Sequence, residues 1–315
     1  MKAMIKLSNK YNNFLVTGGA GFIGSHICEE LLKQDKKVIC LDNFDADFSA
    51  GRMSNIKEFV DDPNFILVEE SVVDFDKIRP HFNDVDVVLH QAASKCTVCR
   101  IDPLKDLMVN ARGSWSVFEA SRQAGVKKVV NAATGSIMDG NPKSFYGVSK
   151  QAGESYLRAF KDYYPEFKYT SLRYHHVYGS KQEKSDVGGV IPIFIRHVHN
   201  DEPTEVFGDG GQVRHFTAVK DVVAANFFAV NDSRTDNMVY NVMSRIKISI
   251  LDLAKMIHKF MDKEENIIHG PDKPGDIRTF LATGEGLEKL DFIYDNDFET
   301  GLKETILWYM ENCGN

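Results

Sequence analysis

The strongest constraint on the fold is an apolar segment that leads directly into a glycine-rich turn. Residues 14–24 read Phe-Leu-Val-Thr-Gly-Gly-Ala-Gly-Phe-Ile-Gly, and a helical segment follows. The glycines suit a tight turn, a close approach of the backbone to a pyrophosphate, and close packing of helix on strand. The positive end of the helix would face the phosphates. This order of elements predicts a dinucleotide site that contains Gly18, Gly21, Phe22, Ile23 and Gly24.

An acidic residue ends the next predicted strand. Asp42 lies 24 positions after Gly18. A carboxylate there accepts hydrogen bonds from ribose hydroxyls and repels a 2′-phosphate, which favours NAD over NADP. We therefore expect Asp42 and Asn43 in an NAD site, although an aspartate is also common at the end of a strand.

The first half of the chain alternates short apolar runs with helical segments. Runs dense in Val, Ile and Leu indicate strands buried on both faces, and the alternation predicts an α/β fold with a Rossmann-type, doubly wound parallel sheet. The predicted strands are Asn13–Thr17, Lys37–Leu41, Asn64–Val68, Asp86–His90, Lys128–Ala133 and Tyr169–Arg173. The main helices expected between them are Phe22–Lys33, Pro103–Ala124 and Phe145–Tyr163.

The alternation of strand and helix ends after about Tyr174. Turn-rich segments there lead into a second helical region, in which the predicted helices are Ser249–Phe260 and Glu299–Met310. We expect an NAD-binding domain over residues 12–175, with 214–243 returning to it. Residues 176–213 and 244–315 would form a smaller, mixed α/β substrate-binding domain. No Pro-rich linker separates these regions, so they should pack closely.

Composition narrows the class of protein. The net charge of −7 argues against broad nucleic-acid binding. No apolar run approaches the ~20 residues that span a bilayer, and the first ten residues lack the pattern of a signal peptide. An odd number of cysteines, five, indicates reduced thiols, so we expect a cytoplasmic protein with no membrane partner.

Two of the cysteines form the motif Cys96-Thr-Val-Cys99. Half of a zinc site and a redox pair are the two functional interpretations. Zinc would require two further ligands, and no second pair with suitable spacing follows, so no metal site is predicted. We interpret the motif as two free thiols in a loop.

The run Phe-Tyr-Gly-Val-Ser-Lys, residues 145–150, contains Tyr146 and Lys150. These two residues are four positions apart and would lie on one face of a predicted helix. A nearby ammonium favours the ionised form of a phenol and lowers its pKa. Tyr146 is therefore a candidate general base near neutral pH. The spacing alone is weak, because an aromatic residue and a lysine one turn apart also occur on ordinary surface helices.

Together these features make the chain resemble an extended short-chain dehydrogenase/reductase, of the NAD-dependent nucleotide-sugar epimerase/dehydratase family. The glycine spacing Gly-x-x-Gly-x-x-Gly is typical of that family, and the resemblance extends from Phe14 to about Trp308. The other matching segments are Val88–Ala93, Asn131–Ile137, Tyr146–Lys150, Leu172–Gly179, Gly208–Arg214 and Pro274–Arg278.

The resemblance implies catalytic roles. Tyr146 would take a proton from a sugar hydroxyl, usually at C4, and Lys150 would hold the nicotinamide ribose. Thr134 matches the Ser/Thr that hydrogen-bonds the same hydroxyl. The chemistry itself would belong to NAD, with the protein supplying orientation and proton transfer.

The resemblance also implies binding roles. Ala92, Ala93 and Lys95 would line the NAD, and Asn110 matches a helical asparagine near the active site. The residues expected to bind a nucleotide-diphosphate sugar are Thr134, Ser136, His176, Arg214 and Arg278. Without the family pattern, both arginines would be interpreted as surface charges.

Several positions depart from the family pattern. Gly135-Ser136 replaces the Asp-Glu that serves water elimination in sugar-nucleotide 4,6-dehydratases, so dehydration is not expected. Met138-Asp139 replaces a common Tyr-Gly, which leaves the sugar undefined. His176 stands in place of an asparagine and His215 in place of an aspartate.

Three hypotheses follow. The first is a nucleotide-sugar 4-epimerase, which oxidises C4 and returns the hydride to the other face. The second is a nucleotide-sugar 4-dehydrogenase or ketoreductase that releases its product. The third is a non-catalytic NAD(H)-binding regulator, which the fold alone would permit. The family usually forms homodimers through two helices, here Pro103–Ala124 and Phe145–Tyr163.

Overall fold

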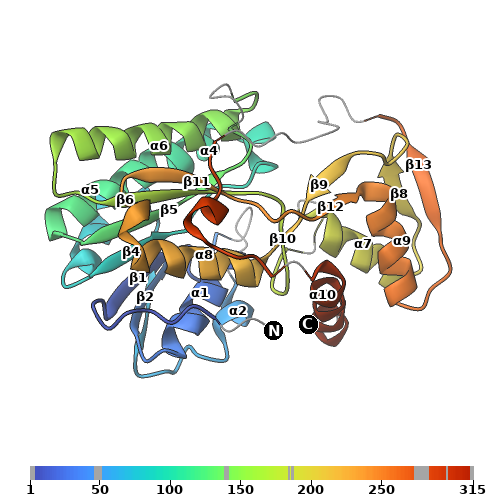
Figure 1. Ribbon diagram of the computed structural model, residues 1–315, viewed down its shortest axis with the longest axis horizontal. Helices are drawn as coiled ribbons and strands as arrows, with labels where there is room; N and C mark the ends of the chain where they lie inside the picture. Colours follow the sequence, from blue (N-terminus) through green and yellow to red (C-terminus); the bar gives the residue numbers. More distant parts are fainter. Residues whose placement is uncertain are drawn as a thin grey trace. The chain divides into compact units, whose positions relative to one another are not determined.

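The computed structural model describes residues 4–45, 52–137, 142–183, 185, 188–272, 284–295 and 297–312. The chain forms two compact units (Figure 1). The first consists of Met1–Tyr174, Val222–Val242 and Thr283–Ile293, and the second of His175–Asp221, Met243–Ala282 and Tyr294–Asn315. Two segments rejoin the first unit. The first is shorter than the expected 214–243, because strands within 213–218 pair with strands of the second unit. The second, Thr283–Ile293, lies within 244–315, which we expected to belong to the substrate-binding domain. Within the described part of the chain, no helix is both long enough and apolar enough to cross a membrane.

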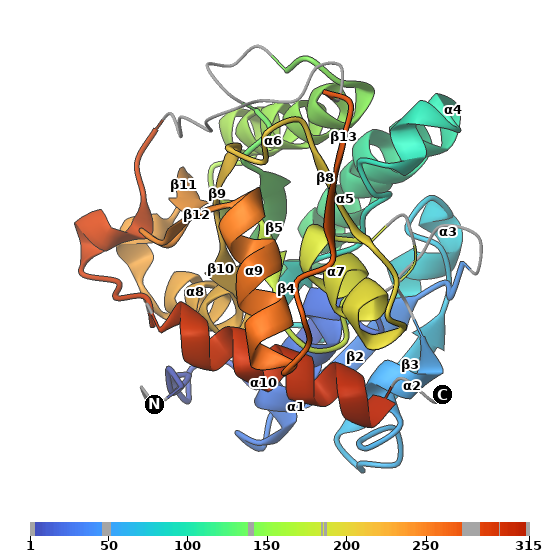
Figure 2. The same ribbon diagram turned by 90° about the vertical axis from the view of Figure 1, so that its right-hand side faces the viewer.

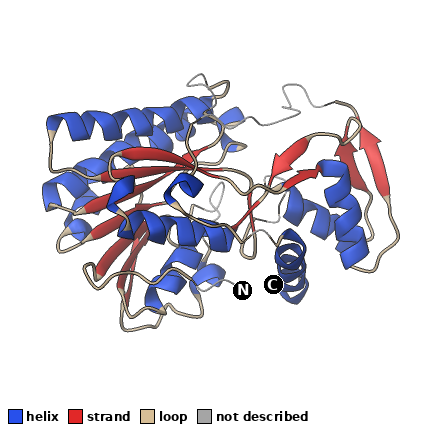
Figure 3. Ribbon diagram, in the orientation of Figure 1, coloured by secondary structure: helices blue, strands red, loops and turns tan. Residues whose placement is uncertain are grey.

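The first unit is built on a seven-stranded parallel sheet with the strand order β11-β6-β5-β4-β1-β2-β3. Figure 3 draws the strands in red between blue helices. The strands are β1 (Asn13–Thr17), β2 (Lys37–Asp42), β3 (Phe65–Glu69), β4 (Val87–His90), β5 (Lys128–Thr134), β6 (Tyr169–Tyr174) and β11 (Met238–Val242). All six strands predicted from the sequence are present, and β11 comes from the returning segment.

Helices cover both faces of this sheet, as expected for strands that are buried on both sides. In Figure 1, α5 (Ser114–Ala124) and α6 (Phe145–Tyr163) lie on one face, and α1 (Phe22–Leu32) and α8 (Val219–Asn231) on the other. Leu15 and Val129 of the sheet share a core cluster with Phe118 of α5. The shorter helical segments of this unit are α2 (Met53–Ile56), α3 (Phe75–Ile78), α4 (Pro103–Asp106) and turns at Arg79–Phe82, Val98–Arg100, Ser233–Thr235 and Leu287–Leu290.

The predicted helix Pro103–Ala124 is continuous but not regular. A π-helical segment, Leu107–Gly113, joins α4 to α5. Such segments insert an extra residue into a turn and are frequent at functional sites. Here the segment carries Asn110, which is fully buried.

The second unit is mixed α/β. Figure 2 shows its helices α7 (Val190–His199), α9 (Ile250–Phe260) and α10 (Phe298–Asn312) beside short strands. Ile195, Ile257 and Leu302 bring the three helices into one core. The strand pairs are β8 (Thr204–Phe207) with β13 (Ile267–Gly270), β9 (Val213–His215) with β12 (Lys247–Ser249), and β7 (Val177–Tyr178) with β10 (Thr217–Ala218).

Candidate active site

The turn after β1 has no room for side chains. Gly18 has a positive φ of 64°, which non-glycine residues rarely adopt, and its amide donates to the Leu41 carbonyl at 2.7 Å. A Cβ on Gly18 would lie 2.8 Å from the backbone nitrogen of Ala92. A Cβ on Gly24 would overlap the carbonyl oxygen of Gly18. The turn is therefore held close to both its helix and the segment after β4.

Helix α1 begins with donors that the helix itself does not use. Gly21 is the cap residue, and no side chain caps the helix. The amides of Phe22 and Ile23 in the first turn have no intrahelical acceptor. Together with the bare glycine turn, they form a cradle that fits the pyrophosphate of a dinucleotide.

The sheet order places this cradle where ligands bind in such folds. The chain runs from β1 outward to β2 and β3 on one side and to β4, β5 and β6 on the other. Ligands of doubly wound sheets bind at the carboxyl ends of the strands at this reversal. Gly18 follows β1, and Ala92 follows β4 after one residue, with its amide donating to Thr17 Oγ1 at 3.2 Å. Ala93 is exposed and Lys95 is half-buried beyond it.

Asp42 ends β2 at the same edge. Its side chain is buried, and its two carboxylate oxygens accept the amides of Ala20 and Phe44, both at 3.0 Å. Burial raises the pKa of Asp42, and these backbone hydrogen bonds partly oppose that shift. Each carboxylate oxygen can accept more than one hydrogen bond, so ribose hydroxyls can still bind. The neighbouring Asn43 is exposed.

Thr134, Tyr146 and Lys150 come together on β5 and α6. The Thr134 hydroxyl lies close enough to the phenol of Tyr146 to lower its pKa, and the amide of Ser136 donates to Thr134 Oγ1 at 3.1 Å. Helix α6 begins beside them because Ser144 caps it, accepting the Gly147 amide at 3.1 Å. This start places Tyr146 in the first turn of the helix and Lys150 one turn later.

The charge state of this group differs from the sequence argument. We expected Lys150 to lower the pKa of Tyr146. In the structure the pKa of Tyr146 is raised, because withdrawal of the phenol from water outweighs the effect of Thr134. Lys150 Nζ donates instead to the Ala132 carbonyl at 2.8 Å. Burial lowers the pKa of Lys150 to about 8.

This group also contains a buried carboxylate that no sequence motif indicated. Asp106 is 1% exposed, and its Oδ1 accepts from Asn110 Nδ2 at 2.8 Å. Its charge opposes the desolvation of Lys150 and so raises the lysine pKa. The side-chain oxygen of Asn110 accepts the Ser94 amide at 2.8 Å, which fixes the backbone beyond Ala93. The spacing of Asp106 and Asn110, four residues apart in an apolar helix, was the available signal.

His90 supports the same region from inside the fold. Ser114 donates its hydroxyl proton to the Asn110 carbonyl at 2.6 Å, so His90 Nε2 must be the donor in its 3.0 Å contact with Ser114. His90 Nδ1 then accepts from Thr17 Oγ1 at 2.6 Å. Burial lowers the pKa of His90 to about 3, which keeps the ring neutral. This chain of bonds ties the π-helical segment to the end of β1.

The remaining predicted substrate residues divide between the units. Ser136 lies in the turn after β5. In the second unit, burial and the charge of Arg214 lower the pKa of His176 to about 3, so this ring stays neutral. Arg214 lies on β9 and is 8% exposed, and the adjacent His215 contacts the Ser244 carbonyl at 3.1 Å. Arg278 and Met138-Asp139 fall outside the described residues.

The sequence profile of the NAD dependent epimerase/dehydratase family matches residues 14–242. The chain belongs to this family. The match includes the glycine turn, the end of β5 and α6, which carry the features described above. NAD is therefore the cofactor of this enzyme, and the glycine cradle and Asp42 fit it.

Individual relatives agree with this assignment. The chain is 31% identical over 312 residues to a putative UDP-glucose 4-epimerase from Methanocaldococcus jannaschii, covering 95% of this chain and 98% of the relative. It is also similar, at 27% identity over 326 residues, to the dTDP-D-glucose 4,6-dehydratase of Mus musculus, covering 96% of this chain and 89% of that protein.

Solved structures show the same fold. The crystal structure of UDP-glucose 4-epimerase with UDP-glucose from Thermotoga maritima has a TM-score of 0.88 and 30% identity, covering 96% of this chain and 99% of that one. A UDP-N-acetylglucosamine 4-epimerase from Methanobrevibacter ruminantium, in complex with UDP-N-acetylmuramic acid, has a TM-score of 0.88 and 31% identity, with coverage of 96% and 99%.

Proposed function

We propose that the protein is an NAD-dependent nucleotide-sugar 4-epimerase. The observation that carries the proposal is the proximity of Thr134 on β5 to Tyr146 on α6, one helical turn from Lys150, at the edge of the sheet that holds the glycine cradle. The first unit would bind NAD, and the second would contribute Arg214 and His176 to the nucleotide diphosphate. Two relatives with solved structures are named as 4-epimerases of UDP-sugars.

Each side chain has a distinct task in this reaction. Thr134 orients the C4 hydroxyl, and Tyr146 removes its proton and later returns one. Lys150 holds the nicotinamide ribose through its ammonium, while Asp106 and Asn110 fix the surrounding backbone. When bound, NAD would supply the hydride acceptor. The 4-keto sugar must then turn before it is reduced on its other face.

Dehydration is disfavoured by the residues that follow Thr134. Gly135 and Ser136 form the turn after β5, and neither can act as an acid or base in water elimination. We therefore do not expect this chain to share the dehydratase activity for which its mouse relative is named. The second candidate is a nucleotide-sugar 4-dehydrogenase or ketoreductase, because Thr134, Tyr146 and Lys150 would serve equally well if the keto sugar left.

The test is to purify the protein, measure bound NAD(H), and screen UDP-, GDP-, dTDP- and CDP-sugars. An equilibrium between two sugars without net change in NADH absorbance supports epimerisation, whereas stoichiometric NADH formation supports the dehydrogenase. Tyr146→Phe should reduce turnover by roughly 10²–10⁴-fold, the usual contribution of a general acid–base group. Tyr156→Phe is the matched control, since Tyr156 lies on the same helix and is 42% exposed. Full turnover by Tyr146→Phe would refute the mechanism.

The proposal includes a cytoplasmic homodimer. The helical stretches 103–124 and 145–163 expose large apolar side chains, which often mark a protein interface. These are Leu104, Leu107, Trp115, Phe145, Val148, Tyr156 and Tyr163. The four cysteines that the structure describes are free thiols, as expected in a reducing compartment. Light scattering should give twice the chain mass, and Val148→Asp should shift the species toward the monomer.

A further inference from the structure

Cys96 and Cys99 lie in one tight turn. Thr97 between them has right-handed helical backbone angles, and the helical turn Val98–Arg100 follows directly. The Cys99 thiol donates to the Cys96 carbonyl at 3.0 Å, and Cys99 is near enough to raise the pKa of Cys96. Cβ atoms three residues apart in helical geometry lie roughly 5–6 Å apart. A disulfide requires Cβ atoms roughly 3.5–4.5 Å apart, so only a small adjustment of the turn would close one.

The two thiols differ in access. Cys96 is exposed, whereas Cys99 is buried and 2% exposed. This is the arrangement of a thiol that meets an external reagent and a second thiol that resolves the adduct. Cys28 and Cys40 of the same unit are fully buried and distant in sequence from the turn, so they provide an internal reference.

The turn lies next to the candidate active site. The segment that contains it packs against α6, and negative charge on either thiol raises the pKa of Tyr146. Both ends of the turn are anchored. On one side Asn110 binds the Ser94 backbone, and on the other Asp102 caps α4 by accepting the Lys105 amide at 2.8 Å. Closing a disulfide would therefore change a turn that packs against α6, the helix that carries Tyr146.

We propose that Cys96 and Cys99 are a modification site at which a low-molecular-weight disulfide oxidises the pair to an intramolecular disulfide that slows turnover at Tyr146. In the first step, the Cys96 thiolate attacks one sulfur of the oxidant and forms a mixed disulfide, and one thiolate leaves. Cys99 then loses its proton and attacks Sγ of Cys96, and the second thiolate leaves. The cysteines give up two electrons and two protons, and the oxidant becomes two thiols.

Zinc is the alternative occupant of such a pair. Within the residues that the structure describes, no third His, Cys, Asp or Glu joins the two thiols in a group that could hold a metal ion. Partial burial and the neighbouring Cys99 raise the pKa of Cys96, so its thiolate is a minor species at neutral pH. Oxidation should consequently become faster as the pH rises toward the alkaline range.

The experiment exposes the NAD-loaded full chain to buffers of reduced and oxidised glutathione and analyses its peptides by mass spectrometry. We expect the peptide with Cys96 and Cys99 to lose two hydrogens, while Cys28 and Cys40 remain free. Turnover should fall by roughly ten- to a hundredfold, the size expected when reacting groups are displaced by up to about 1 Å, and should return with dithiothreitol. Cys96→Ser should keep the reduced-state activity and become insensitive to the oxidant.

The two measurements, peptide mass and turnover, test different parts of the proposal. The turnover arm rests on the proposed function, whereas the disulfide is read by mass alone. Absence of a disulfide at every glutathione ratio, or a stable glutathione adduct on Cys96, would overturn the proposal. So would a disulfide that forms without changing turnover. A reduced protein that converts no sugar nucleotide would count against the proposed function and leave the disulfide to be judged by its mass.

Discussion

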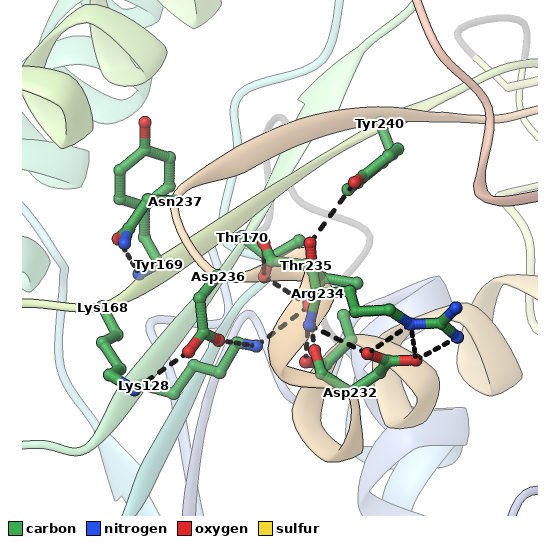
Figure 4. Close-up of polar contacts among 11 residues, drawn as sticks. Lys128, Lys168, Tyr169, Thr170, Asp232, Arg234, Thr235, Asp236, Asn237 and Tyr240 are labelled. Carbon is green, nitrogen blue, oxygen red and sulfur yellow. Dashed lines mark hydrogen bonds and ion pairs between the residues drawn. The ribbon is translucent and has the colours of Figure 1, made fainter. Parts of the chain in front are cut away.

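Replacing Asp236 with alanine should lower the free energy of unfolding by about 3–5 kcal/mol, because it removes the charge partner of a buried lysine. The Lys128 side chain is 3% exposed, and its Nζ lies 2.6 Å from Asp236 Oδ1 (Figure 4). Nζ also donates to Thr235 Oγ1 at 3.0 Å. The second carboxylate oxygen accepts from the half-exposed Lys168 at 3.0 Å. The carboxylate thus joins the starts of β5 and β6 to the segment that leads into β11.

The size of the effect follows from what remains around Lys128. Burial already lowers the pKa of Lys128 although Asp236 attracts its charge, so desolvation outweighs the pairing. The Lys128 ammonium has three protons to donate and bonds Asp236 Oδ1 and Thr235 Oγ1. Without Asp236, only Thr235 Oγ1 of these two acceptors would remain. A loss of about 3–5 kcal/mol is a large fraction of the 5–15 kcal/mol that stabilises a typical domain. At about 2–4 °C per kcal/mol, the Tm should fall by roughly 6–20 °C.

Thermal and urea unfolding of the variant provide the assay, with Lys168→Met as the matched control. The control removes the exposed partner of the same carboxylate and should cost at most about 1 kcal/mol. Lys128→Met in the Asp236→Ala background should recover most of the loss, because it removes the unpaired charge. Turnover at low temperature should not change, since Lys128 and Thr134 lie at opposite ends of β5, roughly 20 Å apart. Equal losses for Lys168→Met and Asp236→Ala, or no recovery in the double variant, would refute the reasoning.

The same pair predicts a pH dependence. Burial opposes the ionisation of Asp236, but hydrogen bonds from Lys128 and Lys168 outweigh it and lower its pKa. The stabilisation is therefore complete above the unfolded-state pKa of about 3.9 and is lost as the pH falls through the lower folded value. The difference in Tm between the native protein and Asp236→Ala should be constant near neutral pH and should narrow below about pH 4.

Three further predictions concern the candidate site. Gly24→Ala should weaken NAD binding at least tenfold in a fluorescence titration, because its Cβ would overlap the Gly18 carbonyl; unchanged affinity would contradict the close packing. NAD affinity should fall as the pH rises through about 8, where Lys150 loses its proton, and Lys150→Met should remove this dependence. Asp106→Asn should move that transition to lower pH, because the carboxylate raises the Lys150 pKa. A transition that stays in place would exclude this role for Asp106.

Local patterns predicted most of the first unit. Every residue of β4 and β5 is buried, and runs of small apolar residues, Val and Leu in β4 and Val and Ala in β5, make these strands predictable from the sequence. The start of α6 was also predictable, because Ser144 provides a cap three residues before Gly147. The partner of β11 was not predictable in this way. Met238–Val242 pairs with β6 after a long excursion through the second unit, and such a contact leaves no local pattern.

The site was only partly predictable for a related reason. Thr134, Tyr146 and Lys150 could be placed by motif, and the structure brings Thr134 into contact with Tyr146. Their charge states depend on how deeply the side chains are buried, and the spacing of residues in a sequence motif does not reveal that burial. The same limit hid Asp106, since a carboxylate in a helix is usually exposed and this one is 1% exposed.

The raised pKa of Tyr146 has a consequence for the order of events. A phenol withdrawn from water holds its proton at neutral pH and cannot act as a base unless a positive charge stabilises its ionised form. In the described structure Lys150 Nζ donates to the Ala132 carbonyl at 2.8 Å, and desolvation of the phenol still raises the pKa of Tyr146. In the proposed mechanism, Tyr146 would therefore act as a base only when a positive charge lies close to its hydroxyl. Under that mechanism, proton abstraction from the sugar would be coupled to the binding of NAD.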